Sequence, residues 1–429
     1  MEHPVADFAP PPPARRRTPV WLFALLQIPY GVSGAFTAAT IGRILKLAHV
    51  DSATIESTIA ASVLVAGIQF LWAPTVDVRL RRRSWYLIMA WTGAALLGAA
   101  MMMPLPSRVG AFIALTLAAQ VAICLTSACL GGLIVTTVPD EQRGRASGFF
   151  NFGNIGVGTL AGGVSLQLLE AHSLPVVGIA VAALTALPSL LVLFVDEPAP
   201  PRRTARELFG TMAREVWATL RQRRGWSGVL LCLSPVGTAA AGQLFTSFAD
   251  AYGVSDRWVT LTNGYLGGAI QGGACLVGGL LCDRVNRRVA YLAAGVATAI
   301  CATAMALGPM TQTTYVVGAL VYMLVTGFCY AAFTAFVLEV VGPAGATAST
   351  QYTLFSSAGN FAISYVIKCE GWGRQAWQAH ASAATGPRGI LFADAALNLV
   401  GVAVFVGVLS VLRRERSAIP GRASASSAP

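Results

Sequence analysis

Charged residues are scarce in this 429-residue sequence. They make up 11% of the chain, against roughly 25% in ordinary soluble domains, while 55% of the residues are hydrophobic. This balance excludes an ordinary soluble protein. A stretch of about 20 apolar residues crosses the hydrocarbon core of a bilayer, and the sequence contains twelve such stretches. We therefore predict an all-α integral membrane protein that is embedded in a lipid bilayer.

Several motifs of enzymes and metal sites are missing. The eight cysteines form no CxxC pair, and the four histidines lack the spacing of metal ligands, so no metal site is predicted. No Walker-type phosphate loop is present, which argues against direct ATP hydrolysis. No GxSxG elbow or facing carboxylate pair indicates an enzyme. We expect no cofactor and no enzymatic activity. Because direct ATP hydrolysis is not indicated, any active transport by this protein should draw on an ion gradient.

The net charge of +11 would suggest nucleic acid as the partner of a soluble protein. However, the sequence has no basic module interleaved with aromatic residues, and nucleic-acid binding is not predicted. The distribution of positive charge between the two sides of the membrane carries more information than its sum. With a cytoplasmic N-terminus, all but seven of the 30 Lys and Arg residues fall in cytoplasmic segments, which places both termini in the cytosol.

The twelve predicted transmembrane helices form two groups of six. The first group comprises residues 20–42, 53–75, 84–104, 109–137, 145–169 and 174–195. The second comprises residues 227–250, 257–281, 288–308, 313–341, 348–370 and 388–411. We accordingly divide the chain into a disordered cytoplasmic tail (1–18), an N-terminal bundle (19–195), a linker (196–226), a C-terminal bundle (227–412) and a second tail (413–429).

The two bundles resemble each other in sequence. Asp77 is followed by Arg81 and Arg82, and Asp283 by Arg287 and Arg288, with an offset of 206 residues (283 − 77). The Gly153-Asn154 pair recurs at the same offset as Gly359-Asn360. The pattern predicts an internal repeat and two pseudo-symmetric halves.

The linker has the pattern of an amphipathic helix. Leu208, Met212, Val216 and Leu220 recur at every fourth position, and five arginines lie among them. We expect this helix to lie on the inner leaflet, where apolar burial and anionic lipid act together. A solvated linker helix is the alternative.

The repeat and the charged loop resemble the major facilitator superfamily. The segment Gly279-Leu280-Leu281-Cys282-Asp283-Arg284-Val285-Asn286-Arg287-Arg288 is a close version of its loop motif. More narrowly, Phe70-Leu71-Trp72-Ala73-Pro74 and Ser349-Thr350-Gln351-Tyr352 are similar to the peptide and acetyl-coenzyme A transporter group. That group includes AmpG-type muropeptide permeases and is related to siderophore permeases. The first helix, with Gln27, Pro29 and Tyr30, departs from the group's pattern.

The resemblance implies a latch in the motif loops. Asp77 and Asp283 would accept hydrogen bonds from arginines and touch neighbouring helix ends, which holds the cytoplasmic side closed. The latch residues implied are Asp77, Arg81, Arg82, Asp283, Arg284, Arg287 and Arg288. The alternative is that these arginines only set the topology.

Polar residues at membrane depth are costly and usually face a cavity or another helix. In the helices that line the superfamily's cavity, the candidates are Gln27, Tyr30, Gln120, Gln243, Tyr330 and Thr334. The adjoining helices contribute Asn151, Asn154, Gln351 and Asn360. For each of these residues the alternative is an ordinary hydrogen bond between helices.

Two carboxyl groups reach inward from the outer side of the predicted bundle, those of Asp250 and Asp394. A carboxyl held away from water favours its protonated form, so both are candidates for proton coupling. The other ionisable groups near the spans, Glu370 among them, are interpreted as interfacial charges.

The sequence thus predicts a secondary transporter that works by alternating access, as a monomer, with protons and a small molecule as partners. Proton-coupled import of a medium-sized polar solute, muropeptide-like or siderophore-like, is the first hypothesis. The alternatives are a proton-driven exporter of drugs or metabolites and a membrane sensor or scaffold that transports nothing. Lysine occurs only at Lys46 and Lys368 while arginine is abundant, which favours a GC-rich bacterial genome and hence the inner membrane.

Overall fold

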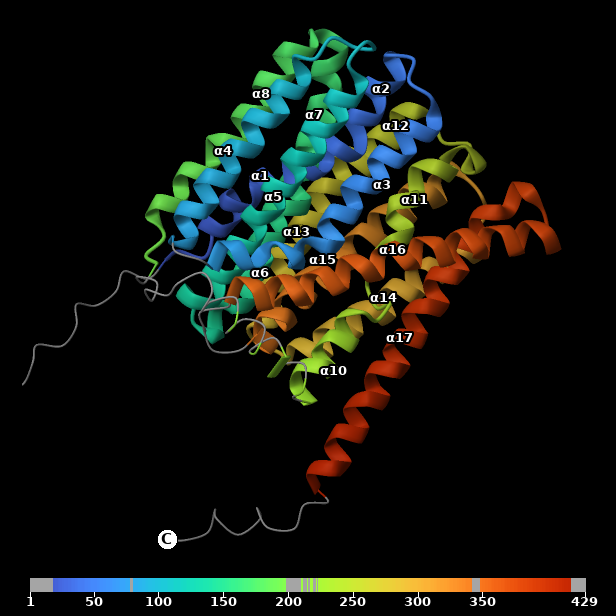
Figure 1. The fold of residues 1–429 in the computed structure, drawn as a ribbon. Coiled ribbons are helices and arrows are strands. Elements are labelled where there is room, and N and C mark those ends of the chain that lie inside the picture. The colour runs from blue at the N-terminus through green and yellow to red at the C-terminus, as the bar shows by residue number, and fades with distance from the viewer. Residues whose placement is uncertain are drawn as a thin grey trace, which may run out of the picture.

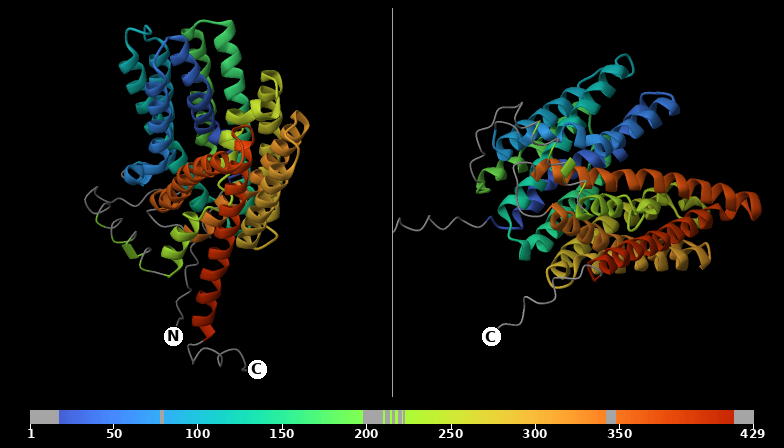
Figure 2. Two further views of the ribbon diagram at one scale, coloured as in Figure 1. Left: turned by 90° about the vertical axis from the view of Figure 1, so that its right-hand side faces the viewer. Right: turned by 60° about the horizontal axis from the view of Figure 1, so that its bottom comes forward.

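The computed structural model describes residues 18–77, 80–197, 223–341 and 348–417, together with residues 210, 214, 217, 218 and 221. These residues form helices and short connections, with no β-strand among them. Figure 1 shows two groups of helices, α1 to α8 from the N-terminal half and α10 to α17 from the C-terminal half. Two further views are given in Figure 2, where α17 projects beyond its neighbours.

The N-terminal half contains α1 (Leu22–Ala35), α2 (Gly42–Leu47), α3 (Ser52–Ile68), α4 (Arg82–Met101), α5 (Val109–Thr137), α6 (Arg143–Asn151), α7 (Gly158–Ala171) and α8 (Leu174–Ala186). Wider, π-helical turns at Phe36–Ile41 and Phe152–Val157 join α1 to α2 and α6 to α7. Tighter 3-10 turns occupy Gln69–Leu71, Ala73–Asp77, Asp140–Gln142 and Pro188–Phe194.

The C-terminal half contains α10 (Arg223–Cys232), α11 (Ala240–Phe248), α12 (Asp256–Thr260), α13 (Gly267–Cys282), α14 (Arg287–Leu307), α15 (Gln312–Val341), α16 (Ala348–His380) and α17 (Gly386–Ser417). A π-helical turn at Leu261–Leu266 joins α12 to α13. Short 3-10 turns lie at Ala249–Tyr252 and Ala383–Thr385.

Eight helical segments among the described residues are long and apolar enough to cross a membrane. They coincide with eight of the twelve predicted spans. The predicted spans 20–42 and 227–250 correspond to α1–α2 and α10–α11, which are interrupted. The span 53–75 corresponds to the shorter α3, and the span 348–370 to α16, whose polar residues lower its hydropathy. The observed helices are therefore consistent with twelve crossings.

The arginine-rich loops lie at one end of the helices, which we call the basic face. It contains the loops before α4, α6 and α14 and the starts of these helices. A hydrophobic core on this side includes residues of both halves, such as Phe23, Leu133, Phe336 and Phe355. Towards the opposite face, each half has a core of its own. The two halves are thus packed together at the basic face and form separate cores beyond it.

Glycine allows the halves to approach closely along α6, α7 and α13. A Cβ atom on Gly148 would lie 2.6 Å from the carbonyl oxygen of Cys275, and one on Gly156 would lie 2.9 Å from the Cα atom of Gly272. Neither contact leaves room for a side chain. These positions require glycine because backbone meets backbone there.

Some residues near the predicted ends of the linker and of the C-terminal bundle lie in the described part of the chain. Glu197, in the predicted linker, is buried and accepts hydrogen bonds from the backbone N–H groups of Arg82 (2.9 Å) and Arg83 (3.1 Å), so it caps α4. The end of the linker belongs to α10, and α17 continues to Ser417. The four apolar residues of the predicted amphipathic helix and the tail 1–17 lie outside the described residues.

Candidate functional site

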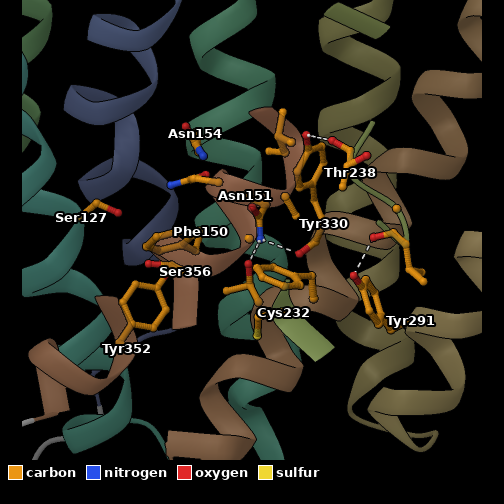
Figure 3. Close-up of a pocket in the computed structure, with 18 of the residues that line it drawn as sticks. Ser127, Phe150, Asn151, Asn154, Cys232, Thr238, Tyr291, Tyr330, Tyr352 and Ser356 are labelled. Carbon is orange, nitrogen blue, oxygen red and sulfur yellow. Dashed lines mark hydrogen bonds between the residues drawn. The ribbon is translucent and has the colours of Figure 1, made fainter. Parts of the chain in front are cut away.

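A cavity lies between the two halves, close to the middle of the long helices. Its volume is about 100 Å³. Its wall contains aromatic side chains and uncharged polar groups, several of which are drawn in Figure 3. None of the described residues that line it is Asp, Glu, Lys or Arg. The wall can therefore offer hydrogen bonds and ring faces, but no ion pair.

One side of the wall is a break in the helical structure between α10 and α11. Residues 233–239, which include Pro235, lie outside both helices, and Gly237 and Ala239 adopt positive φ angles of 59° and 55°. A Cβ atom on Gly237 would lie 1.9 Å from Sγ of Cys329, so glycine is required both by conformation and by space. Ser234, Val236, Gly237 and Thr238 of this break line the cavity.

Side chains from other helices hold the backbone of this break. The hydroxyl groups of three tyrosines donate to its carbonyl oxygens: Tyr291 to Val236 (2.6 Å), Tyr330 to Thr238 (3.1 Å) and Tyr365 to Leu233 (2.7 Å). Two of these bonds are visible in Figure 3. On the other side, the N–H of Gly237 donates to Oδ1 of Asn398 on α17 (2.7 Å). The break is thus fixed by tertiary contacts because the helix cannot supply its hydrogen bonds.

Asn151 connects the two halves at the cavity. Its Nδ2 donates to Oγ1 of Thr334 (2.9 Å), to the carbonyl oxygen of Tyr330 (3.3 Å) and, within its own helix, to that of Ser147 (2.9 Å). Asn360 makes a second connection, from its Nδ2 to the carbonyl oxygen of Ala66 (3.2 Å). Both amides lie in the cavity wall. A change in the separation of the halves must therefore break bonds of cavity residues.

The first motif loop binds the other half at the basic face. The side chain of Asp77 is fully buried, and its carboxylate accepts from Nε of Arg82 (2.9 Å). Its second oxygen accepts from the backbone N–H (3.1 Å) and the hydroxyl (2.9 Å) of Thr350. Arg82 also donates to Oγ of Ser349 (2.9 Å). Asp77 therefore caps the N-terminus of α16, where a negative charge is favourable.

The second motif loop makes the matching contact in the opposite direction. Asp283 accepts from the backbone N–H groups of Gly144 (2.8 Å) and Arg145 (3.2 Å), at the N-terminus of α6. The offset between the capped residues Gly144 and Thr350 is again 206 (350 − 144), equal to that between the two acids. Each half thus caps a helix of the other half through equivalent positions of the repeat.

The arginine partners differ between the two motif loops. Asp283 pairs with Nε of Arg145 (2.8 Å) from the other half, and not with an arginine of its own loop. Arg287 instead donates to Asp140 (3.2 Å), and Arg288 to Glu339 (3.2 Å). Both arginines lie in the first turn of α14, where Asp140 and Glu339 are their acceptors. Arg284 is exposed, and Arg81 is half-buried.

A model of the major facilitator superfamily matches residues 20–365, most of the chain. The chain belongs to the major facilitator superfamily. No curated protein sequence matches it. Among solved structures, it is similar to the proton:xylose symporter XylE bound to 6-bromo-6-deoxy-D-glucose, with 14% identity, a TM-score of 0.63, and coverage of 90% of this chain and 95% of that one. It is also similar to the fucose:proton symporter FucP of E. coli, with 13% identity, a TM-score of 0.65, and coverage of 90% and 98%.

At these identities the likeness shows the fold. The protein is an all-α membrane protein with the major facilitator fold, and a multi-pass transporter of that superfamily. Its described helices are consistent with two six-helix bundles. The family match does not distinguish the groups within the superfamily. The narrower resemblance to muropeptide and siderophore permeases stays a prediction.

In this major facilitator protein, six of the ten predicted cavity residues line the cavity: Tyr30, Asn151, Asn154, Tyr330, Thr334 and Asn360. The other four lie elsewhere. Gln27 is buried and donates to Oγ of Ser127 (3.2 Å), and Gln120 accepts from Oγ of Ser33 (3.0 Å). Gln243 is exposed on α11, and Gln351 is half-buried beside the cap of α16. Gln27 and Gln120 thus make ordinary hydrogen bonds between helices, which is the alternative to a role in the cavity.

Other wall residues were not predicted. Tyr352 ends the Ser349–Tyr352 segment, which carries the family resemblance, and Ser356 lies one turn later. Gly237 follows Pro235 by two residues within a predicted span. A helix interrupted by Pro and Gly is a known sign of a binding site in transporters. That sign was present in the sequence. Phe150 and Phe333 carried no such signal, because an aromatic residue in a span more often faces lipid or core.

The two candidate acids have different surroundings. Asp250 is exposed, in the 3-10 turn that follows α11. Asp394 on α17 is fully buried and accepts from the hydroxyl of Tyr322 (3.2 Å) and from Nδ2 of Asn398 (3.2 Å). The fully buried Glu370, interpreted from sequence as an interfacial charge, lies beside Asp394. Among the described residues, no group of three or more potential ligands could hold a metal ion.

Proposed function

We propose that this major facilitator protein is a proton-coupled importer of an uncharged, medium-sized polar solute, which binds in the cavity between the halves. The observation that carries the proposal is the composition of the wall. Amide and hydroxyl groups from both halves surround the cavity together with aromatic rings, and no charged side chain among the described residues contributes. Such groups recognise hydroxyl and amide groups of a solute, and rings pack against the apolar faces of a sugar.

The contacts of the halves support alternating access. In this conformation the halves share a core and two reciprocal caps at the basic face. A cavity of about 100 Å³ is small beside the 300–1,000 Å³ of typical ligand pockets. We infer that the solute enters from the opposite face and that the caps at the basic face break before it leaves. A monomer suffices, since the two halves of one chain form the whole wall.

The wall also bears on the choice of solute. A muropeptide-like or siderophore-like solute is favoured by the sequence resemblance, and both structural neighbours are named as proton symporters of sugars. We propose that the cavity holds the saccharide part of a muropeptide-like solute or an uncharged chelate, because a carboxylate in the cavity would find no cation. We place the protein in a bacterial inner membrane with the basic face and both termini in the cytosol.

A thermal-shift screen of the purified protein tests the proposal. The panel contains neutral disaccharides, anhydromuropeptides, ferric siderophores with and without net charge, acetyl-coenzyme A and cationic drugs. A ligand that binds the folded state raises the melting temperature as its concentration passes Kd. We expect shifts with uncharged, hydroxyl-rich compounds, and a loss of the shift in Asn360→Ala but not in Phe361→Ala, whose side chain is exposed on the same helix.

Other outcomes would refute parts of the proposal. A shift with cationic drugs alone would favour an exporter. A shift that persists in Asn360→Ala and in Asn151→Ala would place the ligand outside this cavity. If no compound is transported in proteoliposomes although it binds, the sensor hypothesis replaces the importer.

A further inference from the structure

Two acidic side chains meet inside the C-terminal half, away from the cavity wall. Glu370 on α16 and Asp394 on α17 are both 0% exposed. Their carboxyl groups lie next to each other where α16 packs against α17. The described ion pairs include no cation for either acid. This arrangement is not that of two interfacial charges.

Hydrogen bonding distinguishes the two acids. Asp394 accepts from Tyr322 and Asn398, whereas neither oxygen of Glu370 has a well-formed hydrogen bond within the described part of the chain. The amide N–H of Ala241 approaches Glu370 without completing one. Two adjacent buried carboxylates repel each other strongly, and a buried acceptor without a donor is costly. One proton between the two carboxyls removes the repulsion and provides one donor, because a protonated carboxyl donates an O–H.

Within the described part of the chain, the other titratable groups that face the pair are Cys301 on α14, Tyr322 on α15 and Cys369 on α16. None of them is positively charged, so none replaces the proton. On the side of α11 the pair faces the backbone at Ala241. A proton is therefore the positive charge that this site can take up.

The pair is connected to the cavity through one side chain. Asn398 donates from Nδ2 to Oδ1 (3.2 Å) and to the backbone carbonyl (2.9 Å) of Asp394, one turn earlier on α17. Its Oδ1 accepts from the N–H of Gly237 (2.7 Å), in the helix break that lines the cavity. Because all of these groups are buried, a change of charge at Asp394 is not screened by water before it reaches the break.

We propose that Glu370 and Asp394 together form a proton-binding site, and that Asn398 transmits its protonation state to residues 233–239 of the cavity wall. The inference rests on the proposed function and names the proton site of that transport cycle. On this assignment the pair holds one proton in the conformation described. When the O–H bond breaks, the proton moves to water and the pair gains one negative charge. Tyr322 and Asn398 then turn further towards the carboxylates, and Asn398 releases the N–H of Gly237.

Infrared difference spectroscopy of the purified protein in lipid nanodiscs tests the proton itself and needs no substrate. We expect a carbonyl band of a buried carboxylic acid that disappears as the pH is raised. The band should be lost in E370Q and in D394N and retained in E170Q, which changes an exposed acid at the end of α7. A wild-type spectrum without a titrating buried acid would overturn the proposal, even if neither variant folds. A band that is lost only in D250N would assign the proton to the other sequence candidate.

Hydrogen–deuterium exchange tests the connection. After correction for intrinsic exchange, we expect amide protection at residues 233–239 to fall as the pair loses its proton. In N398A the protection should be low and independent of pH, while the infrared band remains. Protection that follows pH in N398A as in the wild type would refute the transmission by Asn398.

The proposed importer and the proposed proton-binding site can be refuted independently of each other. A titrating band without uptake of any solute would refute the importer and leave the proton site. Uptake driven by a pH gradient that is unchanged in E370Q and D394N would refute the site and leave the importer.

Discussion

Removing the carboxylate of Asp283 should open the basic face. In the structure this side chain is 11% exposed and accepts three hydrogen bonds from the other half, at 2.8, 3.2 and 2.8 Å. Asp283→Ala removes the cap of α6 and the ion pair with Arg145. The helix that loses its cap belongs to the other half, so the cost falls mainly on the closed arrangement of the halves.

The magnitude follows from the two kinds of contact. Loss of an N-cap costs about 0.5–2 kcal/mol. The ion pair adds about 0.2–1 kcal/mol, because the side chain of Arg145 is 41% exposed and solvent weakens the attraction. Together we expect roughly 1–3 kcal/mol against the closed arrangement, which shifts the equilibrium between open and closed forms by about five- to 150-fold. Asp77→Ala should have a similar effect because Asp77 makes the equivalent cap on α16.

The assay is a distance measurement across the basic face. Labels introduced through noncanonical amino acids at Glu141 and Arg284, both exposed and in different halves, report the separation. We expect a longer distance population in Asp283→Ala, and a larger one in the double variant with Asp77→Ala. Glu170→Ala serves as the control. If the distance distribution of the double variant coincides with that of the wild type, the two acids do not hold the halves together.

Further predictions concern the helix break and the wall. Gly237→Ala should lower the melting temperature strongly, because its φ is positive and its Cβ would lie 1.9 Å from Sγ of Cys329, whereas Gly264→Ala, with no atom within 4 Å of its Cβ, should not. We expect the first substitution to cost at least about 1–3 kcal/mol of unfolding free energy, checked by thermal unfolding in detergent. Asn360→Ala should weaken uptake in proteoliposomes by about tenfold, the worth of one good hydrogen bond, and Phe361→Ala should leave it unchanged.

Most of the fold could be predicted from the sequence because membranes impose simple rules. A helix must be long and apolar to cross, and arginines must stay outside the hydrocarbon, so the spans and the sidedness could be proposed from composition alone. The internal repeat also predicted that the chain consists of two pseudo-symmetric halves. The same offset of 206 relates the acids Asp77 and Asp283 and the helix ends that they cap, although a periodicity does not reveal which residue accepts which bond.

The sequence was less informative about side chains inside the bundle. Gln27 and Asn151 are both buried amides in spans, but only Asn151 reaches the cavity, because orientation around a helix depends on packing with the partner helices. Glu370 and Asp394 are 24 residues apart and on different helices (394 − 370). Their contact depends on the antiparallel packing of α16 and α17. The ion partner of Asp283 could not be predicted either, since Arg145 comes from the other half.

Uptake by proteoliposomes under an imposed pH gradient tests the central claim most directly. The ligand is the compound that gives the largest thermal shift, and a pH-sensitive dye inside the vesicles records proton movement. We predict uptake that depends on an alkaline interior, is accompanied by internal acidification, and falls in Asn360→Ala but not in Phe361→Ala. Uptake that is indifferent to the pH gradient and to both substitutions would contradict a proton-coupled importer with its site in this cavity.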